Sequence, residues 1–234
     1  MQRRITNWNE FSETIRRNAF DDWIYRGVCR IEHTTLIPKI GRSTARALDK
    51  EGMRLSYDPV DERDLLEQFK RRAPALSEYR NLTDLEWLAV AQHHGMPTRL
   101  LDWTESPLVA AYFATDPMPG IGGPAYIIAI KGLRHVPDED FPVDTQDVCL
   151  FQPPHLSPRI PAQNCVFTYH PTPSEKPKLA SSVEMERWEI AREACGELSF
   201  MLDRCGINAT SMFPDLDGLA RYLEWRYKWF ARPW

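Results

Sequence analysis

The most informative segment of this chain is residues 92–107, which read Gln-His-His-Gly-Met-Pro-Thr-Arg-Leu-Leu-Asp-Trp-Thr-Glu-Ser-Pro. Upstream, Thr83 and Glu86 form a capping-box pattern before an apolar helix, and Gly95 is at a position where helices end in a left-handed turn. Downstream, Ser106 and Pro107 are typical of an N-cap and a first helical residue, where free backbone N–H groups favour anions. Residues 98–104 are therefore predicted to form a loop or short strand, and the polar residues around them indicate a ligand site.

The composition indicates a globular domain without a general affinity for polyanions. The chain has 234 residues, 43% of them hydrophobic, which is enough for one core. A net charge of -4 and a pI near 5.9 give no broad attraction to nucleic acid or anionic membranes. No stretch approaches the 18 apolar residues of a membrane span, and the N-terminal residues are polar. We therefore predict a cytoplasmic protein with no membrane contact.

The five cysteines do not form a metal-binding or disulfide pattern. They are Cys29, Cys149, Cys165, Cys195 and Cys205. Their number is odd, their spacing is uneven, and no Cys-x-x-Cys pair occurs. Reduced thiols and the absence of a metal site are predicted.

Hydrophobic spacing predicts helices and strands that do not alternate regularly. Helices are expected over residues 7–20, with Trp8, Phe11 and Ile15 inward, and over residues 61–73, with Leu65, Leu66 and Phe69 inward. Further helices are expected over 83–94, 107–114 and 191–204 and from Asp215 onward. Strands are expected over 23–28, 125–130, 163–169 and 183–190, a loop over 30–51, a turn over 117–124 and a long ordered, lid-like excursion over 133–161. This mixture is typical of an α+β fold.

The whole chain, residues 1–234, is predicted to be one domain. An N-terminal helix would cover the core, and an aromatic helix would form the C-terminal end. The aromatic rings of residues 222–234 are expected to dock on the core, although a protein interface or a base-stacking surface is an alternative.

Several blocks of residues resemble a known family in both content and order. They are Tyr25-Arg26-Gly27, Gln92-His93-His94-Gly95, Asp102-Trp103-Thr104, residues 110–114 and residues 213–219. These blocks resemble the signature of the FRG domain over about residues 20–225. The FRG domain is in turn distantly similar to the ADP-ribosyltransferase fold, which implies a central, mostly antiparallel split sheet flanked by helices and NAD as co-substrate.

The resemblance to ADP-ribosyltransferases assigns roles to three segments. The first core strand of that fold carries an Arg or His that faces NAD, a position matched here by Arg26. The second carries a Ser/Thr-rich motif before a helix, which Trp103 to Ser106 resembles. A later strand presents a catalytic Glu, but Gln163 stands at the matching place. A Gln side chain can bond a ribose hydroxyl, yet it carries no charge and takes no proton.

This departure leaves the source of the catalytic acid open. Transfer would be slow, would rely on Glu105 or Asp102, or would not occur; Glu184 or Glu186 from another strand is a further candidate. The resemblance thus implies Arg26, Gln163 and Glu105 as catalytic residues. It implies a substrate-binding set consisting of Tyr25, Arg26, Gly27, Gln92, His93, Arg99, Asp102, Trp103, Thr104 and Ser106.

Each of these residues also has a structural interpretation. Arg26 and Arg99 suit a pyrophosphate because a guanidinium offers a planar fork of donors, but either Arg could instead pair with Asp102. His93 and His94 suit a helix C-terminus and point about 100° apart, so they cannot share one metal. Trp103 could pack in the hydrophobic core or stack on the base of a bound nucleotide. Thr104 and Ser106 suit a helix start or ribose hydroxyls.

Three functions are compatible with this sequence. The first is an NAD-dependent ADP-ribosyltransferase that modifies a protein or nucleic acid, acting as a bacterial toxin or antiviral effector with a neutralising antitoxin or trigger protein. The second is a non-catalytic module that keeps the pocket to recognise a nucleotide or nucleic acid. In the third, the signature residues only build a buried polar network.

Overall fold

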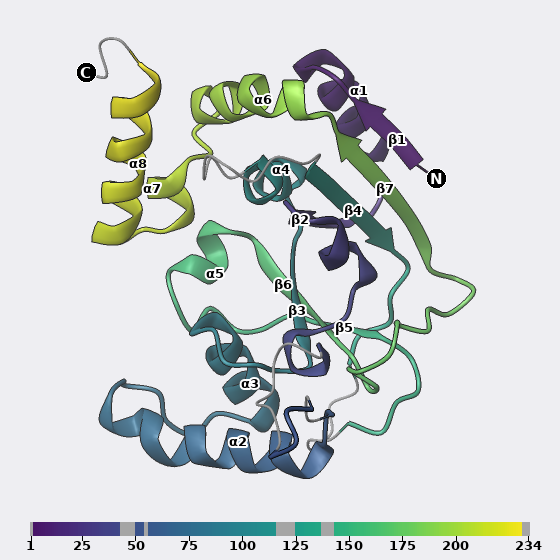
Figure 1. The fold of residues 1–234 in the computed structure, drawn as a ribbon, viewed down its shortest axis with the longest axis vertical. Helices are drawn as coiled ribbons and strands as arrows, with labels where there is room; N and C mark the ends of the chain where they lie inside the picture. The colour runs from purple at the N-terminus through teal and green to yellow at the C-terminus, as the bar shows by residue number, and fades with distance from the viewer. Residues whose placement is uncertain (1, 43–49, 54–55, 116–124, 137–142, 231–234) are drawn as a thin grey trace.

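The computed structural model describes residues 2–42, 50–53, 56–115, 125–136 and 143–230 (Figure 1). Within them, seven strands form one mixed sheet in the order β1-β7-β4-β2-β3-β6-β5. Only β1 and β7 pair in parallel, and the other neighbours are antiparallel. The strands are β1 (Gln2–Ile5), β2 (Ile24–Val28), β3 (Leu100–Thr104), β4 (Ala125–Lys131), β5 (Cys149–Phe151), β6 (Cys165–Tyr169) and β7 (Glu184–Ile190).

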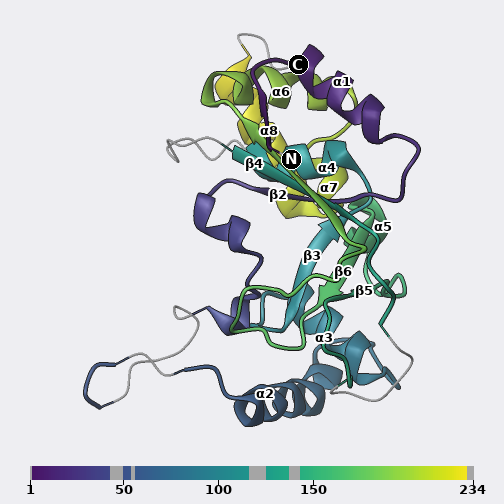
Figure 2. The ribbon, with the colours of Figure 1, turned by 90° about the vertical axis from the view of Figure 1, so that its right-hand side faces the viewer.

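Helices flank this sheet, which confirms the predicted α+β class. They are α1 (Trp8–Asn18), α2 (Pro59–Arg72), α3 (Asp84–His93), α4 (Pro107–Thr115), α5 (Arg159–Ala162), α6 (Arg192–Arg204), α7 (Ala209–Met212) and α8 (Leu216–Trp229). Short 3-10 turns cover Ile31–Thr35, Lys39–Gly41 and Ala73–Ala75. Figures 1 and 2 show α1 and α6 at one end of the molecule and α2 and α3 at the other.

Apolar residues of the sheet pack in three clusters. In the first, α1, α4 and α6 cover one face of β1, β7, β4 and β2, and Phe11 meets Trp188 with ring centroids 6.5 Å apart. In the second, α2 and α3 pack against β3 and β6, where Leu88 and Phe167 are buried. The third includes Trp103 and Ile128. The β4 strand is buried along nearly its whole length, as its sequence predicts.

Strands β2 and β3 meet at only one residue pair, Tyr25 opposite Thr104. By contrast, β2 pairs with β4 along its whole length, and β3 does the same with β6. The two halves of the sheet are therefore linked by a single residue pair. The residues of β2 and β3 beyond this pair do not face each other as partners and can line a cavity.

Local sequence signals determine the ends of the helices on both sides of β3. Thr83 and Glu86 form the predicted capping box at the start of α3, and Gly95 has a φ of +83° just after its end. Ser106 accepts a hydrogen bond from the Val109 N–H at the start of α4, 3.4 Å away. Because a Cβ on Gly27 would lie 1.8 Å from the Ala110 carbonyl oxygen, only glycine lets α4 pack this closely on β2.

Some predicted elements differ in the structure. β1 and β5 were not expected, because each is short and gains its backbone partners from a strand remote in sequence. Residues 98–104, expected to form a loop or a short strand, contain strand β3, and the 133–161 excursion contains β5 and the start of α5. Leu65, expected inward, is exposed, while Leu66 is buried. The turn expected over 117–124 lies outside the described residues.

Candidate functional site

A cavity of about 350 Å³ opens where β2 and β3 part. It is lined by residues of β2, β3, β6, α3, α4 and α5 and by Phe213 after α7. Its size lies at the lower end of small-molecule sites. Most residues of the predicted site line it: Tyr25, Arg26, Gly27, Gln92, His93, Asp102, Trp103 and Thr104 of the substrate-binding set, and Gln163 of the catalytic set. Arg99, Glu105 and Ser106 are not among its lining residues.

The Arg26 guanidinium spans the gap between the two diverging strands. Its Nη1 donates to the Asp102 carbonyl oxygen at 2.6 Å and lies 3.7 Å from the Asp102 carboxylate. The Arg26 side chain is only 14% exposed, and its buried Nε has no hydrogen-bond partner among the described residues. Burial lowers the pKa of this guanidinium, and the charge of Asp102 opposes that shift. A buried, incompletely bonded cation is well placed to receive an anion.

Asp102 is held by a short chain of polar side chains. Gln92 donates to its carboxylate at 2.9 Å, and Thr98 donates to the Gln92 side-chain oxygen at 2.7 Å. Among the described residues that line the cavity, Asp102 is the only carboxylate. The chain therefore orients the one acidic group that the cavity offers.

Gln163 lies at the turn that enters β6. Its side-chain amide donates to the Met212 carbonyl at 2.9 Å, and its own carbonyl accepts from the Thr104 hydroxyl at 2.7 Å. The next residue, Asn164, has a φ of +43°, a left-handed conformation that Asn tolerates better than most residues. The hydrogen bond from Thr104 ties this turn to the end of β3, and the turn places Gln163 at the cavity.

The Thr104 hydroxyl is already engaged on both sides, since it also accepts from the Ser106 N–H at 3.0 Å. Trp103 lies mainly in the core, where its ring nitrogen donates to the Thr168 hydroxyl at 2.8 Å. His93 lines the cavity from the end of α3, and burial lowers its pKa. These residues therefore contribute mainly to the shape of the cavity and less to hydrogen bonding with a ligand.

Arg99 does not pair with Asp102 as one interpretation proposed. Its guanidinium makes a two-point contact with the buried Glu62 of α2, with N···O distances of 3.0 and 2.6 Å. It also donates to the hydroxyls of Tyr57 and Tyr169. Burial alone would lower the pKa of Arg99, but the hydrogen bonds and charge of Glu62 raise it. Arg99 thus anchors α2 to the sheet.

Two other predicted residues point elsewhere. Glu105 is exposed, and its carboxylate accepts from the Gln152 amide at 3.3 Å. Ser106 caps α4. The proposed alternatives Glu184 and Glu186 lie on β7, which is separated from β2 by β4, and neither lines the cavity.

Several lining residues had no predicted role. Arg159 of α5 bonds Asp215 at 2.6 Å and lies over the Phe213 ring, 5.1 Å from its centroid. Phe213 in turn meets Phe113 of α4 edge-on, with centroids 6.1 Å apart. The sequence could have pointed to Phe213, because this residue belongs to one of the signature blocks. It gave no such indication for Arg159, which lies in a segment without hydrophobic periodicity.

The charges around the cavity favour a negatively charged ligand. Burial lowers the pKa of His33, and the positive charges of Arg42 and Arg26 lower it further. Arg26 and Arg159 face the cavity, against the single carboxylate of Asp102. Because Arg159 is paired with Asp215, the positive charge available to an anion such as a phosphate group is mainly that of Arg26, whose Nε has no partner among the described residues.

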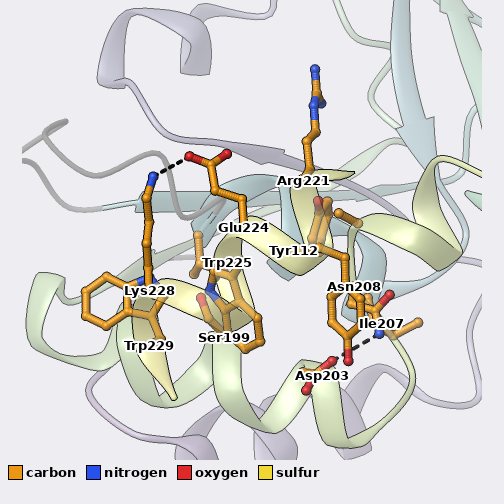
Figure 3. A pocket seen from close by; sticks show the side chains of 13 residues that line it. Tyr112, Ser199, Asp203, Ile207, Asn208, Arg221, Glu224, Trp225, Lys228 and Trp229 are labelled. Carbon is orange, nitrogen blue, oxygen red and sulfur yellow. Dashed lines mark hydrogen bonds and ion pairs between the residues drawn. The ribbon is translucent and has the colours of Figure 1, made fainter. Parts of the chain in front are cut away.

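A second cavity, of about 410 Å³, lies between α6 and α8 (Figure 3). It contains none of the predicted site residues. Within the described residues, no group of three His, Cys, Asp or Glu side chains could hold a metal ion. In the same part of the chain, no helix is long and apolar enough to cross a membrane.

Comparison with family models covers four of the five signature blocks, and residues 213–219 lie outside the matched range. No curated protein and no solved structure matches the chain. Residues 21–119 match the family model named FRG domain. This range includes β2, α3, β3 and α4, which supply most of the cavity described above. The match supports the assignment of this chain to the FRG family.

Proposed function

We propose that this protein is an NAD-dependent ADP-ribosyltransferase that acts on a protein or nucleic-acid acceptor. One observation carries the proposal. Arg26, Thr104 and Gln163, which the resemblance to ADP-ribosyltransferases selected from three separate segments, lie around one cavity. The guanidinium of Arg26, with its unbonded Nε, suits the pyrophosphate of NAD.

The contacts of these residues suggest how the substrate would be held. Arg26 would bond the pyrophosphate through the Nε that has no partner among the described residues. Phe113 and Phe213 offer rings for an aromatic base, a role that the buried Trp103 is poorly placed to fill. Thr104 would act by positioning Gln163 rather than by binding ribose, because its hydroxyl is already engaged.

In the proposed reaction, the bond between nicotinamide and the ribose C1′ breaks, and nicotinamide leaves with the bonding electrons. The acceptor atom forms a new bond to C1′ and loses a proton. Asp102 is the candidate base for that proton, because it is the only carboxylate among the described lining residues. Gln163 would orient a ribose hydroxyl through its side-chain oxygen.

A non-catalytic nucleotide-recognition module is the second candidate. It is favoured by the side chain of Gln163, which is neutral and is tied to the Met212 carbonyl. Such a group can select a nucleotide but cannot stabilise a developing cation at C1′. In either case, a cytoplasmic toxin or antiviral effector with a neutralising partner is the biological role we propose.

The test is incubation of the purified protein with adenylate-labelled NAD and fresh cell lysate. Label is then divided among free nucleotide, protein and nucleic acid. Arg26→Ala is compared with Arg16→Ala, a matched change at an exposed arginine of α1. Circular dichroism confirms that each variant is folded.

We expect the wild type and Arg16→Ala to transfer label and Arg26→Ala to lose transfer. Asp102→Asn should lower the transfer rate at least about tenfold while NAD still binds. Binding without transfer in the wild type would favour the recognition module. No transfer and no NAD binding would refute the transferase and leave either a module that recognises another ligand or a structural network.

A further inference from the structure

The cavity between α6 and α8 has an aromatic lining and a volume, about 410 Å³, that suits a small molecule. Its rings come from Tyr112 of α4 and from Tyr222, Trp225 and Trp229 of α8 (Figure 3). Trp225 also packs on Phe200 of α6, with ring centroids 5.5 Å apart, which attaches α8 to the molecule. Aromatic rings bind apolar groups by contact and bind cations through the negative charge of their faces.

The positively charged side chains that line this cavity already have partners within the molecule. Lys228 donates to Glu224 of its own helix at 2.6 Å. The Arg221 guanidinium lies over the Phe213 ring, 5.2 Å from its centroid. Figure 3 shows the Arg221 side chain pointing away from Asp203, the remaining charged residue of the lining. Neither cation is therefore placed to neutralise Asp203.

Asp203 is a carboxylate without a counter-ion among the described residues. Its Oδ1 accepts a hydrogen bond from the Asn208 side-chain amide at 3.0 Å, and none of the described residues donates to its Oδ2. The side chain is partly buried, so a charge beside it is screened less than at an exposed position. Together with the aromatic lining, this carboxylate favours a positively charged ligand.

Helix α7 connects this second cavity with the first cavity, where β2 and β3 part. Asn208 and Ala209, at the start of α7, line the second cavity. At the other end of α7, the Met212 carbonyl accepts from the Gln163 side-chain amide at 2.9 Å, and Phe213 lines the first cavity. Backbone hydrogen bonds of 2.9 Å, from Met212 to Asn208 and from Phe213 to Ala209, hold the two ends together.

Helix α4 makes a second connection between the cavities. Tyr112 lines the second cavity and its neighbour Phe113 lines the first, with ring centroids 5.3 Å apart. Phe113 in turn meets Phe213, which also contacts Arg221 of the second cavity. Because packed side chains cannot move independently, a ligand that displaces Tyr112 or Arg221 also displaces groups of the first cavity.

We propose that the cavity between α6 and α8 binds a small organic cation with an apolar body, and that this ligand is an effector of the first cavity. The cationic group would pair with Oδ2 of Asp203, and the apolar body would lie against the rings of α8. Through α7, binding would change the position of Gln163. Such coupling is reciprocal, so a ligand in the first cavity would change the affinity for the cation by the same factor.

The first experiment uses phenethylamine, which carries an ammonium group on an aromatic body at neutral pH. Phenethyl alcohol and hydrocinnamate have a similar shape but are neutral and anionic. Binding is followed by the NMR signal of the Trp225 indole N–H, which is assigned from its loss in Trp225→Phe. We expect phenethylamine to shift this signal to saturation and the other two compounds to bind at least about tenfold more weakly.

Two variants test the residues that would hold the cation. Asp203→Asn removes the charge and keeps an oxygen for Asn208, so phenethylamine should bind at least about tenfold more weakly. Trp229→Ala removes a ring that is 53% exposed and should weaken binding at least about threefold without unfolding the protein. Circular dichroism confirms that each variant is folded.

Asp64→Asn is the matched control for the change of charge. Asp64 is exposed on α2, and Figures 1 and 2 show α2 at the other end of the molecule from α8. This variant should bind phenethylamine as the wild type does.

The second experiment tests the coupling to the first cavity. The NMR signal of the Gln163 side-chain amide, assigned from its loss in Gln163→Leu, should move during the same titration and with the same midpoint as the Trp225 signal. The side-chain amide of Gln68 on α2 is the control and should not move.

A Trp225 signal that phenethylamine does not shift would overturn the proposed site. Equal binding of the three compounds, or unchanged binding to Asp203→Asn, would show that the cavity does not select a cation. If the Trp225 signal moves and the Gln163 signal does not, the effector role is wrong. None of these results depends on NAD or on transferase activity.

Discussion

Arg26 and Arg99 are chemically identical, yet the fold gives them opposite surroundings. Arg99 has its guanidinium satisfied by Glu62 and two tyrosine hydroxyls. Arg26 keeps a buried Nε with no partner among the described residues. The sequence marked both as candidate phosphate ligands, because a guanidinium suits either role. The partner of Arg99 comes from α2, 37 residues away, and no local pattern predicts such a pair.

The buried Glu62–Arg99 pair should be essential for stability. Glu62→Gln leaves the Arg99 charge buried without its counter-ion, so we expect a loss of about 3–5 kcal/mol in the free energy of unfolding. Urea titration measures the change. Glu67→Gln on the same helix is the control, because its partner Lys70 is at the surface, and a loss of about 1 kcal/mol or less is expected. Equal effects would contradict the structural role of Glu62.

His170 should make the protein sensitive to mild acid. Its Nε2 lies 2.9 Å from the Thr168 hydroxyl, and its buried Nδ1 has no hydrogen-bond partner among the described residues. Burial lowers the pKa of His170 from 6.5 to about 3, and the charges of Arg26 and Arg99 act in the same direction. Below about pH 6.5, the His170 ring therefore binds a proton in the unfolded chain but stays neutral in the folded protein.

The stability contributed by neutral His170 is complete above pH 6.5 and falls as the pH drops from there toward 3. The expected slope is about 1.4 kcal/mol per pH unit below about pH 6. Urea titrations at about pH 7, 6 and 5 measure it, and His170→Asn should flatten the curve. His33 and His93 shift in the same direction, so the diagnostic quantity is the difference between wild type and variant. Parallel curves would show that His170 is not the group responsible.

At the scale of elements, most helices and the long strands were predictable because their signals are local. The capping box at Thr83, the N-cap at Ser106 and the buried run of β4 all read directly from the sequence. β1 and β5 were missed, because a strand of three or four residues is stabilised by its partner and not by its own pattern.

The contact between α4 and β2 should tolerate no side chain at Gly27. Gly27→Ala places a Cβ within 1.8 Å of the Ala110 carbonyl, so α4 must move, and a loss of at least about 3 kcal/mol is expected. Thermal unfolding followed by circular dichroism measures it. Gly196→Ala in α6 is the control, because nothing lies within 4 Å of its Cβ position, and a gain of about 0.5–1 kcal/mol is expected. A Gly27→Ala protein as stable as the wild type would refute the close packing.

At the scale of the whole molecule, the fold gives the five cysteines different exposure, which sets how fast each thiol can react. Cys205 is exposed, Cys149 is buried, and burial raises the pKa of Cys165 and Cys195. A raised pKa lowers the thiolate fraction, and burial blocks access of a reagent.

A thiol-reactive dye should therefore modify Cys205 fastest in the native protein. All five cysteines should react after denaturation, because Cys29, Cys149, Cys165, Cys195 and Cys205 are free. Cys205→Ser should remove the fast phase and leave the slow ones. A fast phase that persists in this variant would contradict the lower accessibility of the four remaining thiols, of which Cys149 is buried and Cys29, Cys165 and Cys195 are partly buried.

The sequence by itself determined the α+β class, the position of most helices, and a polar segment whose residues, with others, line one cavity. These features depend on neighbours three or four positions apart, so local patterns encode them. Only the tertiary structure decided that Arg99 is structural, that Gln163 is tied to Met212, that Asp102 is the carboxylate among the described lining residues and that a second cavity lies between α6 and α8. Each of these depends on contacts between distant segments, which form only when the sheet and its helices pack together.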